Sequence, residues 1–320
     1  VEDEQQNYQV VIFGESLVSY GIDTETLESQ TGKKTMQVSI GGEYMMDMYY
    51  LVQEMYKHQT PETVIIDIDH TYWKDIPLKE NTVTSTLVYN NYPASFRKLS
   101  YFNEAMMNKE YRAVLFPWMN YRDHYSEVWN IFKTKNSEAY RNYDASLVKQ
   151  GFSCDTYKGK GFIYRDRTFL RDENAKVQIT WHETQEDTIS SAMYLKKIIS
   201  VCKDKGSKVI MMSMPMNTET ILMNQESIDA YNQIHKYFQK QAEDNQVEYY
   251  DFNLVRTEQY ERSAEDYWDY NGHMYGDAAG RFSKMLGTFF WELEKQGIVE
   301  QKSYFYEDVS QMVGKIDINK

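Results

Sequence analysis

Short apolar runs alternate with amphipathic stretches near both ends of the chain. The apolar runs lie at residues 10–13, 36–40, 63–68, 208–213 and 247–251, and their flanking turns predict buried strands. Helical periodicity and capping signals predict helices at residues 23–29, 45–58, 186–203, 219–243 and 276–294. This order predicts an α/β protein, a flavodoxin-like three-layer sandwich with about five parallel strands and helices on both faces.

The alternation stops over residues 72–181, a tract with aromatic clusters and polar turns. We expect a single domain over residues 1–320, in which residues 72–181 form an inserted subdomain of helices and a small hairpin. A segment that leaves the third strand departs from the edge of the sheet where sites are built, and a connection longer than about 12–15 residues is usually a functional lid or disordered. The Trp and Tyr content argues against disorder, so we expect the insertion to cover the carboxyl ends of the strands.

Composition and charge exclude several classes of protein. Hydrophobic residues make up 42% of the chain and aromatic residues 15%, with only 5 prolines, which is typical of a packed core and not of disorder. The net charge of −13 argues against a nucleic-acid partner, because such binding needs clustered Lys and Arg. Cys154 and Cys202 lack zinc-ligand spacing, and His182 lacks the second histidine of a metalloprotease motif, so we expect no metal and no cofactor.

Residues with candidate chemistry collect in the loops that follow the predicted strands. In an open parallel sheet the site lies outside the carboxyl ends of the strands. Ser16 follows the first strand, Gly42 the second and His70 the third, while His273 follows the fifth. A serine hydroxyl needs an adjacent imidazole as base, and the imidazole needs an acceptor on its other nitrogen. Ser16, His273 and Asp269 supply these three groups.

Five segments carry a pattern larger than any single motif. They read FGESLVSYGI at residues 13–22, VSIGGEY at 38–44, FPWMNYRDHYSEVW at 116–129, KGKGFIY at 158–164 and WDYNGHMYGDAAGRF at 268–282. Together they resemble the SGNH/GDSL hydrolase superfamily, and within it the exported branch related to alginate O-acetylation proteins and to the D-alanyl-transfer proteins of teichoic acid.

The resemblance implies roles for particular residues. Ser16 matches the family's nucleophile and His273 its base. The family places its acid three residues before the histidine, where this chain has Tyr270; Asp269 stands four residues before His273 and Asp266 seven before. Both carboxylates are candidates, and we expect Asp269 to be the acid because a loop can absorb one extra residue.

The oxyanion hole and the substrate contacts also follow from the resemblance. The backbone N–H groups of Ser16 and Gly42 are expected to stabilise the oxyanion. The family's third block offers an asparagine as a further donor, which this chain lacks, and His70 is the nearest polar candidate. In the insertion, His124 and Trp118 are expected to bind substrate; the alternative is that His124 anchors the insertion among its own aromatic residues.

The activity that the resemblance implies is acyl-ester chemistry on a cell-envelope glycan. An O-acyl group such as acetyl would be hydrolysed, or transferred to a sugar hydroxyl, through an acyl-Ser16 intermediate. The resemblance also implies a membrane-bound acyltransferase as partner and an extracytoplasmic location, with anchoring or secretion through a segment before Val1. Two other classes stay open: a non-catalytic glycan-binding protein of an envelope-modification complex, and an esterase or thioesterase for small substrates.

Overall fold

The computed structural model describes residues 7–73, 83–107, 112–116, 125–138, 154–181, 185–296 and 301–315. The main sheet contains β1 (Val10–Gly14), β2 (Thr35–Ser39), β3 (Thr63–Asp67), β6 (Lys208–Ser213) and β7 (Glu248–Asp251). The helices around it are α1 (Ser16–Gly21), α2 (Thr24–Thr31), α3 (Met45–His58), α9 (Gln185–Asp204), α10 (Thr218–Ile221), α11 (Gln225–Asn245), α12 (Gly276–Gln296) and α13 (Gln301–Tyr304). Between β3 and α9 lie α4 (Val83–Asn91), α5 (Phe96–Tyr101), a π-helical turn (Phe102–Met106), α6 (Arg112–Leu115), α7 (Val128–Lys135), β4 (Asp155–Gly159) and β5 (Phe162–Arg165).

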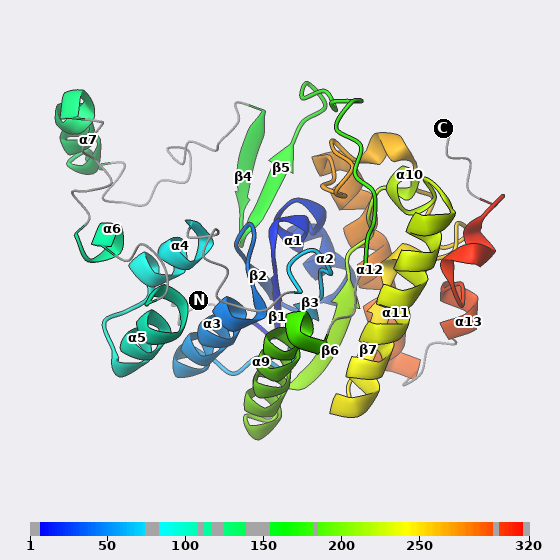
Figure 1. Cartoon of the computed structure of the whole chain (residues 1–320), viewed down its shortest axis with the longest axis horizontal. Coiled ribbons are helices and arrows are strands. Elements are labelled where there is room, and N and C mark those ends of the chain that lie inside the picture. Colours follow the sequence, from blue (N-terminus) through cyan, green and yellow to red (C-terminus); the bar gives the residue numbers. More distant parts are fainter. Residues whose placement is uncertain are drawn as a thin grey trace.

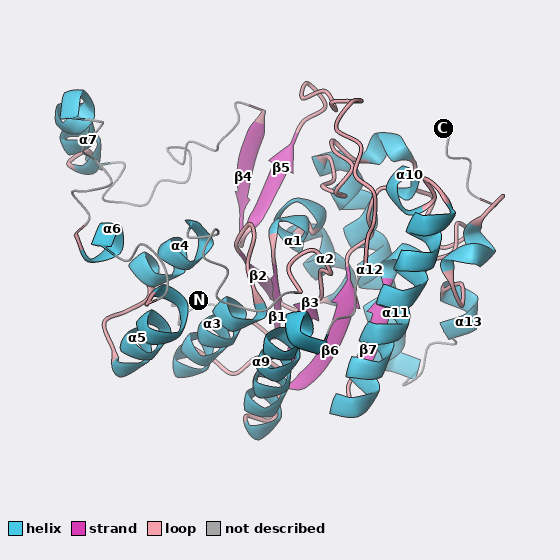
Figure 2. Cartoon of the chain, in the orientation of Figure 1, coloured by secondary structure: helices cyan, strands magenta, loops and turns pink. Residues whose placement is uncertain are grey.

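The five strands of the main sheet are parallel and stand in the order β2-β1-β3-β6-β7. This arrangement confirms the predicted α/β sandwich (Figures 1 and 2). The chain passes from β1 to β2 on one side and returns to β3 on the other, so the strand order reverses between β1 and β3. In open α/β sheets, ligands bind outside the strand ends at such a reversal. The loops after β1, β2 and β3 therefore form the natural place for a site.

Helices cover both faces of the sheet. Helices α3, α9 and α11 form a layer on one face, while α1, α2 and α12 pack together on the other (Figure 1). The central strands are buried on both sides, which explains why they read as continuous apolar runs in the sequence. Within the described parts of the chain, no helix combines the length and the apolar character that crossing a lipid bilayer requires.

Two features differ from the sequence-based expectation. The helix predicted at residues 219–243 is two helices, because Asn224 interrupts it and its side chain accepts from the N–H of Ser227 to start α11. In addition, α1 begins directly at Ser16, where a turn was expected. The Glu15 side chain caps this short helix by accepting from the N–H of Leu17.

The described part of the 72–181 segment contains the helices and the antiparallel hairpin that were expected, the hairpin being β4–β5. This hairpin packs against α1 and α12 at the carboxyl side of the sheet (Figure 1). Its turn is anchored on β2, where the N–H of Gln37 donates to the carbonyl of Lys160. A Cβ atom at Gly161 would lie 2.5 Å from the Gln37 carbonyl oxygen, so only glycine allows this close approach.

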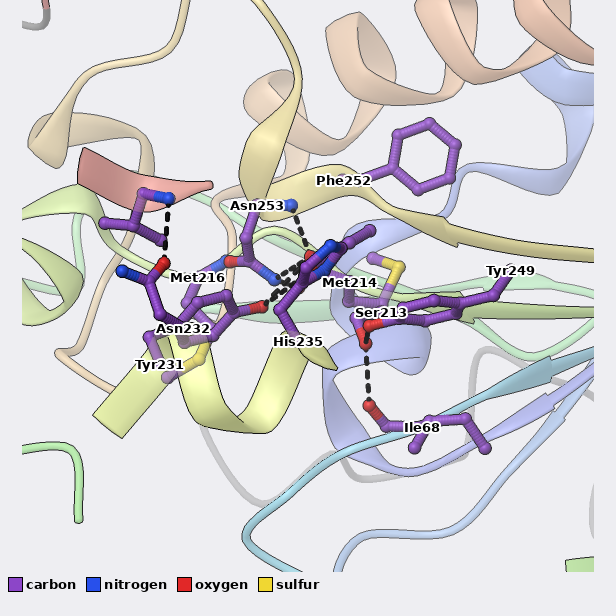
Figure 3. Close-up of polar contacts among 12 residues, drawn as sticks. Ile68, Ser213, Met214, Met216, Tyr231, Asn232, His235, Tyr249, Phe252 and Asn253 are labelled. Carbon is purple, nitrogen blue, oxygen red and sulfur yellow. Dashed lines mark hydrogen bonds and ion pairs between the residues drawn. The ribbon is translucent and has the colours of Figure 1, made fainter. Parts of the chain in front are cut away.

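Tyr231, His235 and Asn253 gather beyond the end of β7 (Figure 3). There they surround the buried carboxylate of Asp251. Asp251 lies 2.9 Å from Nδ1 of His235 and accepts hydrogen bonds from the Tyr231 hydroxyl and from the Asn253 backbone and side chain. Burial alone would raise the pKa of Asp251, but these hydrogen bonds and the charge of His235 hold the pKa below its ordinary value. The hydrogen-bonding capacity of this carboxylate is therefore used by structural partners, and Asp251 is not a candidate catalytic residue.

Asp251 and its partners also support the loop after β6. Asn253 accepts from the N–H of Met216 and donates to the carbonyl of Met214 (Figure 3). Farther along the same loop, the Asn217 side chain donates to the carbonyl of Asp269 at 3.4 Å. Packing at the far end of the sheet is thus connected to the loop that carries the candidate acid.

Replacing Asp251 by alanine is expected to destabilise the protein by about 3–5 kcal/mol, because the change leaves several buried polar groups without their acceptor. Chemical denaturation followed by circular dichroism measures this loss. Asp229→Ala, which removes an exposed carboxylate from α11, is the matched control and should leave stability nearly unchanged. Equal stability of the two variants would contradict the structural role of Asp251.

Candidate active site

The nucleophile candidate stands on a sharp turn between β1 and α1. Gly14 closes the strand, and a Cβ atom there would lie 2.3 Å from a methyl carbon of Val18 and 2.8 Å from Cβ of Asp67. Only glycine allows the strand and the helix to approach so closely. The turn presents Ser16 as the first residue of α1, with its side chain partly exposed at the carboxyl end of the sheet.

The structure brings Ser16, His273 and Asp269 into one hydrogen-bonded chain. The distance from Ser16 Oγ to His273 Nε2 is 2.7 Å, and the distance from His273 Nδ1 to Asp269 Oδ2 is 2.6 Å. Both distances confirm the geometry expected from the sequence. The other candidate, Asp266, instead forms an ion pair with Arg281 and accepts from the N–H of Ser263. The carboxylate on the outer nitrogen of His273 is therefore Asp269.

The loop between Asp269 and His273 absorbs the extra residue by folding around the carboxylate. Asp269 Oδ1 accepts hydrogen bonds from the backbone N–H groups of Asn271, Gly272 and His273, at 3.0–3.1 Å. Gly272 has a φ of 110°, which favours glycine, and a Cβ there would lie 2.8 Å from Cα of Met216. One oxygen of Asp269 thus shapes the loop while the other orients the imidazole.

Aromatic rings fix the orientation of the His273 ring. Trp268 stacks on His273 with ring centres 4.7 Å apart, and Tyr20 meets the imidazole edge-on at 5.7 Å. The guanidinium of Arg165, carried by the β4–β5 hairpin, lies 3.9 Å from the centre of the Trp268 ring. Two oxygens of Asp155 hold this buried guanidinium in place. The inserted segment therefore contributes to the packing around the candidate base.

Electrostatics at the site favour an imidazole that binds a proton readily. Burial alone would lower the pKa of His273, but the hydrogen bond and charge of Asp269, with the charges of Glu15 and Asp69, raise it above the ordinary value. Burial alone would raise the pKa of Asp269, but its hydrogen bonds to His273 and to the loop lower it. An ionised Asp269 beside a basic His273 is the arrangement that a general base requires.

Glu15 is a second partner of the nucleophile. Its Oε2 atom accepts a hydrogen bond from the Ser16 hydroxyl at 2.5 Å. This carboxylate and the His273 ring therefore both contact Ser16 Oγ. Burial, together with the negative charge of Asp69, raises the pKa of Glu15, which is only 4% exposed. Because Ser16 has a single proton, donation to an ionised Glu15 withdraws that proton from His273. Glu15 therefore influences which acceptor the nucleophile uses.

Replacing Glu15 by glutamine is expected to move the acid limb of the kcat/KM profile for a small acyl ester to lower pH, by about one unit. A histidine that acts as the base must be neutral, so activity should fall as the pH falls through the pKa of His273. The negative charge of Glu15 is one cause of that raised pKa, and the neutral amide removes it. The amide keeps an oxygen to cap α1 and an N–H to donate to Ser16. Glu25→Gln on the exposed side of α2 is the control, and superimposable profiles for all three proteins would refute the expectation.

The expected oxyanion donors other than Ser16 lie in the turn after β2 and in the loop after β3. The turn after β2 flanks the nucleophile, since a Cβ at Gly41 would lie 3.8 Å from Cβ of Ser16. Gly42 follows in this turn with a φ of 73°. His70 packs edge-on against Tyr231 with ring centres 6.4 Å apart. The donation of hydrogen bonds to an oxyanion by Ser16, Gly42 and His70 stays a prediction.

Two residues predicted from the sequence lie outside the described part of the structure, and three residues at the site were not predicted from the sequence. Trp118 and His124 lie in residues 117–124, which the structure does not describe, so their substrate-binding role stays a prediction. Sequence reasoning missed Arg165, Tyr20 and Glu15. For Glu15 the signal was its position directly before the serine; for Arg165 no local pattern points to the site.

No protein-family model and no curated protein matches this chain. Among solved structures, a GDSL-like lipase from Bacteroides thetaiotaomicron is 9% identical over 93% of each chain, with a TM-score of 0.38. A catalytic mutant of an acetylxylan esterase from Geobacillus stearothermophilus is 13% identical over 91% of this chain and 95% of that one, with a TM-score of 0.36. Similarity at this level supports no statement about activity.

Proposed function

We propose that this protein is a serine-dependent enzyme of the SGNH type that acts on acyl esters through Ser16. The observation that carries the proposal is the hydrogen-bonded chain from Asp269 through His273 to Ser16 at the carboxyl end of β1. A nucleophile, a base and an orienting acid in this order define a triad by geometry and not by position in the sequence.

The first half of the proposed reaction forms an acyl-enzyme. His273 Nε2 takes the proton of the Ser16 hydroxyl while Oγ attacks the acyl carbon. The oxyanion that develops would be stabilised by the N–H groups of Ser16 and Gly42. The tetrahedral intermediate then collapses, and the proton on His273 passes to the departing alcohol oxygen. Asp269 holds the tautomer in which Nδ1 carries a proton and Nε2 is free to accept one.

The second half releases the acyl group. Water, or a sugar hydroxyl, gives its proton to His273 and attacks the acyl carbon, and Ser16 recovers its proton as it leaves. Hydrolysis and transfer differ only in the attacking group. We propose an O-acyl group, such as acetyl, on a cell-envelope glycan as the substrate. The support for this substrate class is the resemblance of residues 13–22 and 268–282 to envelope-modifying proteins.

An extracytoplasmic location and a membrane-bound acyltransferase partner complete the proposal. Their support is the resemblance of residues 13–22 and 268–282 to envelope-modifying relatives. Expression of the full-length gene product, followed by fractionation into cytoplasmic, membrane and extracytoplasmic pools, tests the location.

Labelling with a fluorophosphonate tests the proposed chemistry directly. The reagent should modify the wild-type protein once, at Ser16, and peptide mass spectrometry identifies the site. Incubation with an acetyl ester, with and without a glycan oligomer, then separates hydrolysis from transfer by the product that accumulates. Glycan binding without any labelling at Ser16 would refute the catalytic proposal and favour a non-catalytic glycan-binding protein.

A further inference from the structure

Exposed apolar side chains concentrate in one part of the described chain. Among the described residues, fourteen large hydrophobic side chains are exposed, and nine of them lie within residues 83–135. These nine are Leu87, Phe96, Leu99, Met107, Leu115, Phe116, Val128, Trp129 and Phe132. Single exposed apolar residues are ordinary, but a concentration of this kind marks an interaction surface. We call the described residues of this stretch, 83–107, 112–116 and 125–135, the docking segment.

The most exposed side chains of the docking segment come in pairs on its helices. Phe96 and Leu99 stand three residues apart on α5 and are 89% and 58% exposed. Trp129 and Phe132 stand three residues apart on α7 and are 65% and 57% exposed, with their rings stacked at 5.7 Å. Residues three apart share one face of a helix, so each pair forms an apolar face.

The docking segment also has a net positive charge, whereas the rest of the chain has a net negative charge. It contains five Lys and Arg against two Asp and Glu, whereas the rest of the chain contains 30 against 46. Lys133 and Lys135 are exposed in the last turn of α7, directly beside its apolar pair. A basic segment on a strongly acidic protein favours an anionic surface as its partner and directs that segment toward it.

An apolar groove lies where the docking segment meets α3 on the body of the protein. It lies between α3 and α4, has a volume of about 550 Å³ and is lined by Leu51, Leu87, Val88 and Pro93, among others. In Figure 1, α5, α6 and α7 lie at the end of the molecule opposite α12 and α13. Apolar side chains, an apolar groove and basic side chains therefore belong to one end of the protein.

We propose that the docking segment binds the surface of an anionic lipid bilayer. Interfacial helices bury Trp, Phe and Leu at the boundary of the acyl chains, while Lys side chains reach the anionic headgroups. Aromatic and basic residues together are typical of this environment. The segment lies on the surface and does not span the bilayer. A protein partner would use the apolar faces equally well, but it would not require the net positive charge.

Vesicle flotation tests the proposal with the whole chain and with lipids of stated composition. The protein should float with vesicles of phosphatidylcholine and phosphatidylglycerol and much less with phosphatidylcholine alone, and about 0.5 M NaCl should weaken its binding. The Trp129→Ser, Phe132→Ser double variant should bind the anionic vesicles at least about tenfold more weakly, because the two large apolar side chains that would be buried in the bilayer are removed. Lys133→Glu with Lys135→Glu should remove the preference for anionic lipid.

Matched variants outside the docking segment serve as controls. Met193→Ser with Trp291→Ser removes two side chains that are 43% and 46% exposed, and Lys284→Glu with Lys295→Glu reverses two exposed charges on α12. These variants should float like the wild type, and all variants should share its melting temperature because the substituted side chains are exposed.

The outcomes separate the bilayer from a protein partner. Equal binding to neutral and anionic vesicles, or no binding to either, would overturn the proposal. Equal loss in the control variants would also overturn it, because binding would then be non-specific. A purified membrane protein that captures the wild type but not the Trp129 variant, without vesicle binding, would identify a protein partner in place of lipid. Turnover of a soluble ester is independent of these results.

Discussion

Replacing Ser16 by alanine is expected to lower the turnover of a small acyl ester by about 10⁶-fold, as loss of the nucleophile does in other serine triads. The methyl group cannot form the acyl-enzyme, and the residual rate comes from binding and the oxyanion donors alone. Because Ser16 is the first residue of α1 and is capped by Glu15, its own side chain is not needed to start the helix. The fold should therefore survive, and steady-state kinetics with an acetyl ester measures the loss.

Ser19 supplies the matched control for this experiment. It stands one helical turn farther along α1, and its hydroxyl donates to Ser39 on β2. Ser19→Ala removes the same atoms from the same helix without touching His273, so its turnover should stay close to that of the wild type. Comparable rates for the Ser16 and Ser19 variants would remove Ser16 from the mechanism and with it the proposed activity.

Replacing Asp269 by asparagine is expected to lower turnover by about 10⁴-fold, through the loss of the imidazole tautomer. The amide oxygen can still accept from the N–H groups of Asn271, Gly272 and His273, so the loop should keep its shape. The amide N–H₂ then faces His273 Nδ1 and makes that nitrogen an acceptor. The ring proton moves to Nε2, which can no longer take the proton of Ser16.

Asp266 provides the comparison that distinguishes the two candidate acids. Asp266→Asn weakens the ion pair with Arg281 but leaves the Asp269–His273 contact in place. We expect a modest loss of stability and a turnover near that of the wild type. If Asp266→Asn lost more activity than Asp269→Asn, the assignment of the acid would be wrong. The assignments of the nucleophile and the base would not change.

The fold and the grouping of Ser16, His273 and Asp269 are largely predictable from the sequence. The fold follows from the apolar runs, and the three residues follow from their positions after strands together with a resemblance spread over five segments. The five strands are apolar runs of the right length, and a parallel sheet brings their carboxyl ends to one edge. Ser16 and His273 are 257 residues apart, yet both lie in loops at that edge. Asp269 was also predictable, because a loop of four residues can wrap back onto the histidine.

The contacts that tune the site were not predictable, because they depend on packing between distant elements. Arg165 reaches Trp268 only after the β4–β5 hairpin docks on α1, and periodicity in the sequence carries no information about that docking. The break between α10 and α11 was missed for a different reason. Asn224 is a strong cap, but it sits in a stretch whose helical periodicity continues on both sides.

The loop that folds around Asp269 has a consequence for protein engineering. Shortening this loop by one residue, to give the three-residue spacing of the SGNH pattern, would do more than move a carboxylate. Asp269 Oδ1 is the acceptor on which three successive backbone N–H groups converge, so a deletion removes the scaffold together with the acid. Grafting this candidate site onto another scaffold therefore requires transplanting residues 268–273 as one unit, together with the surface of Met216 that packs against Gly272.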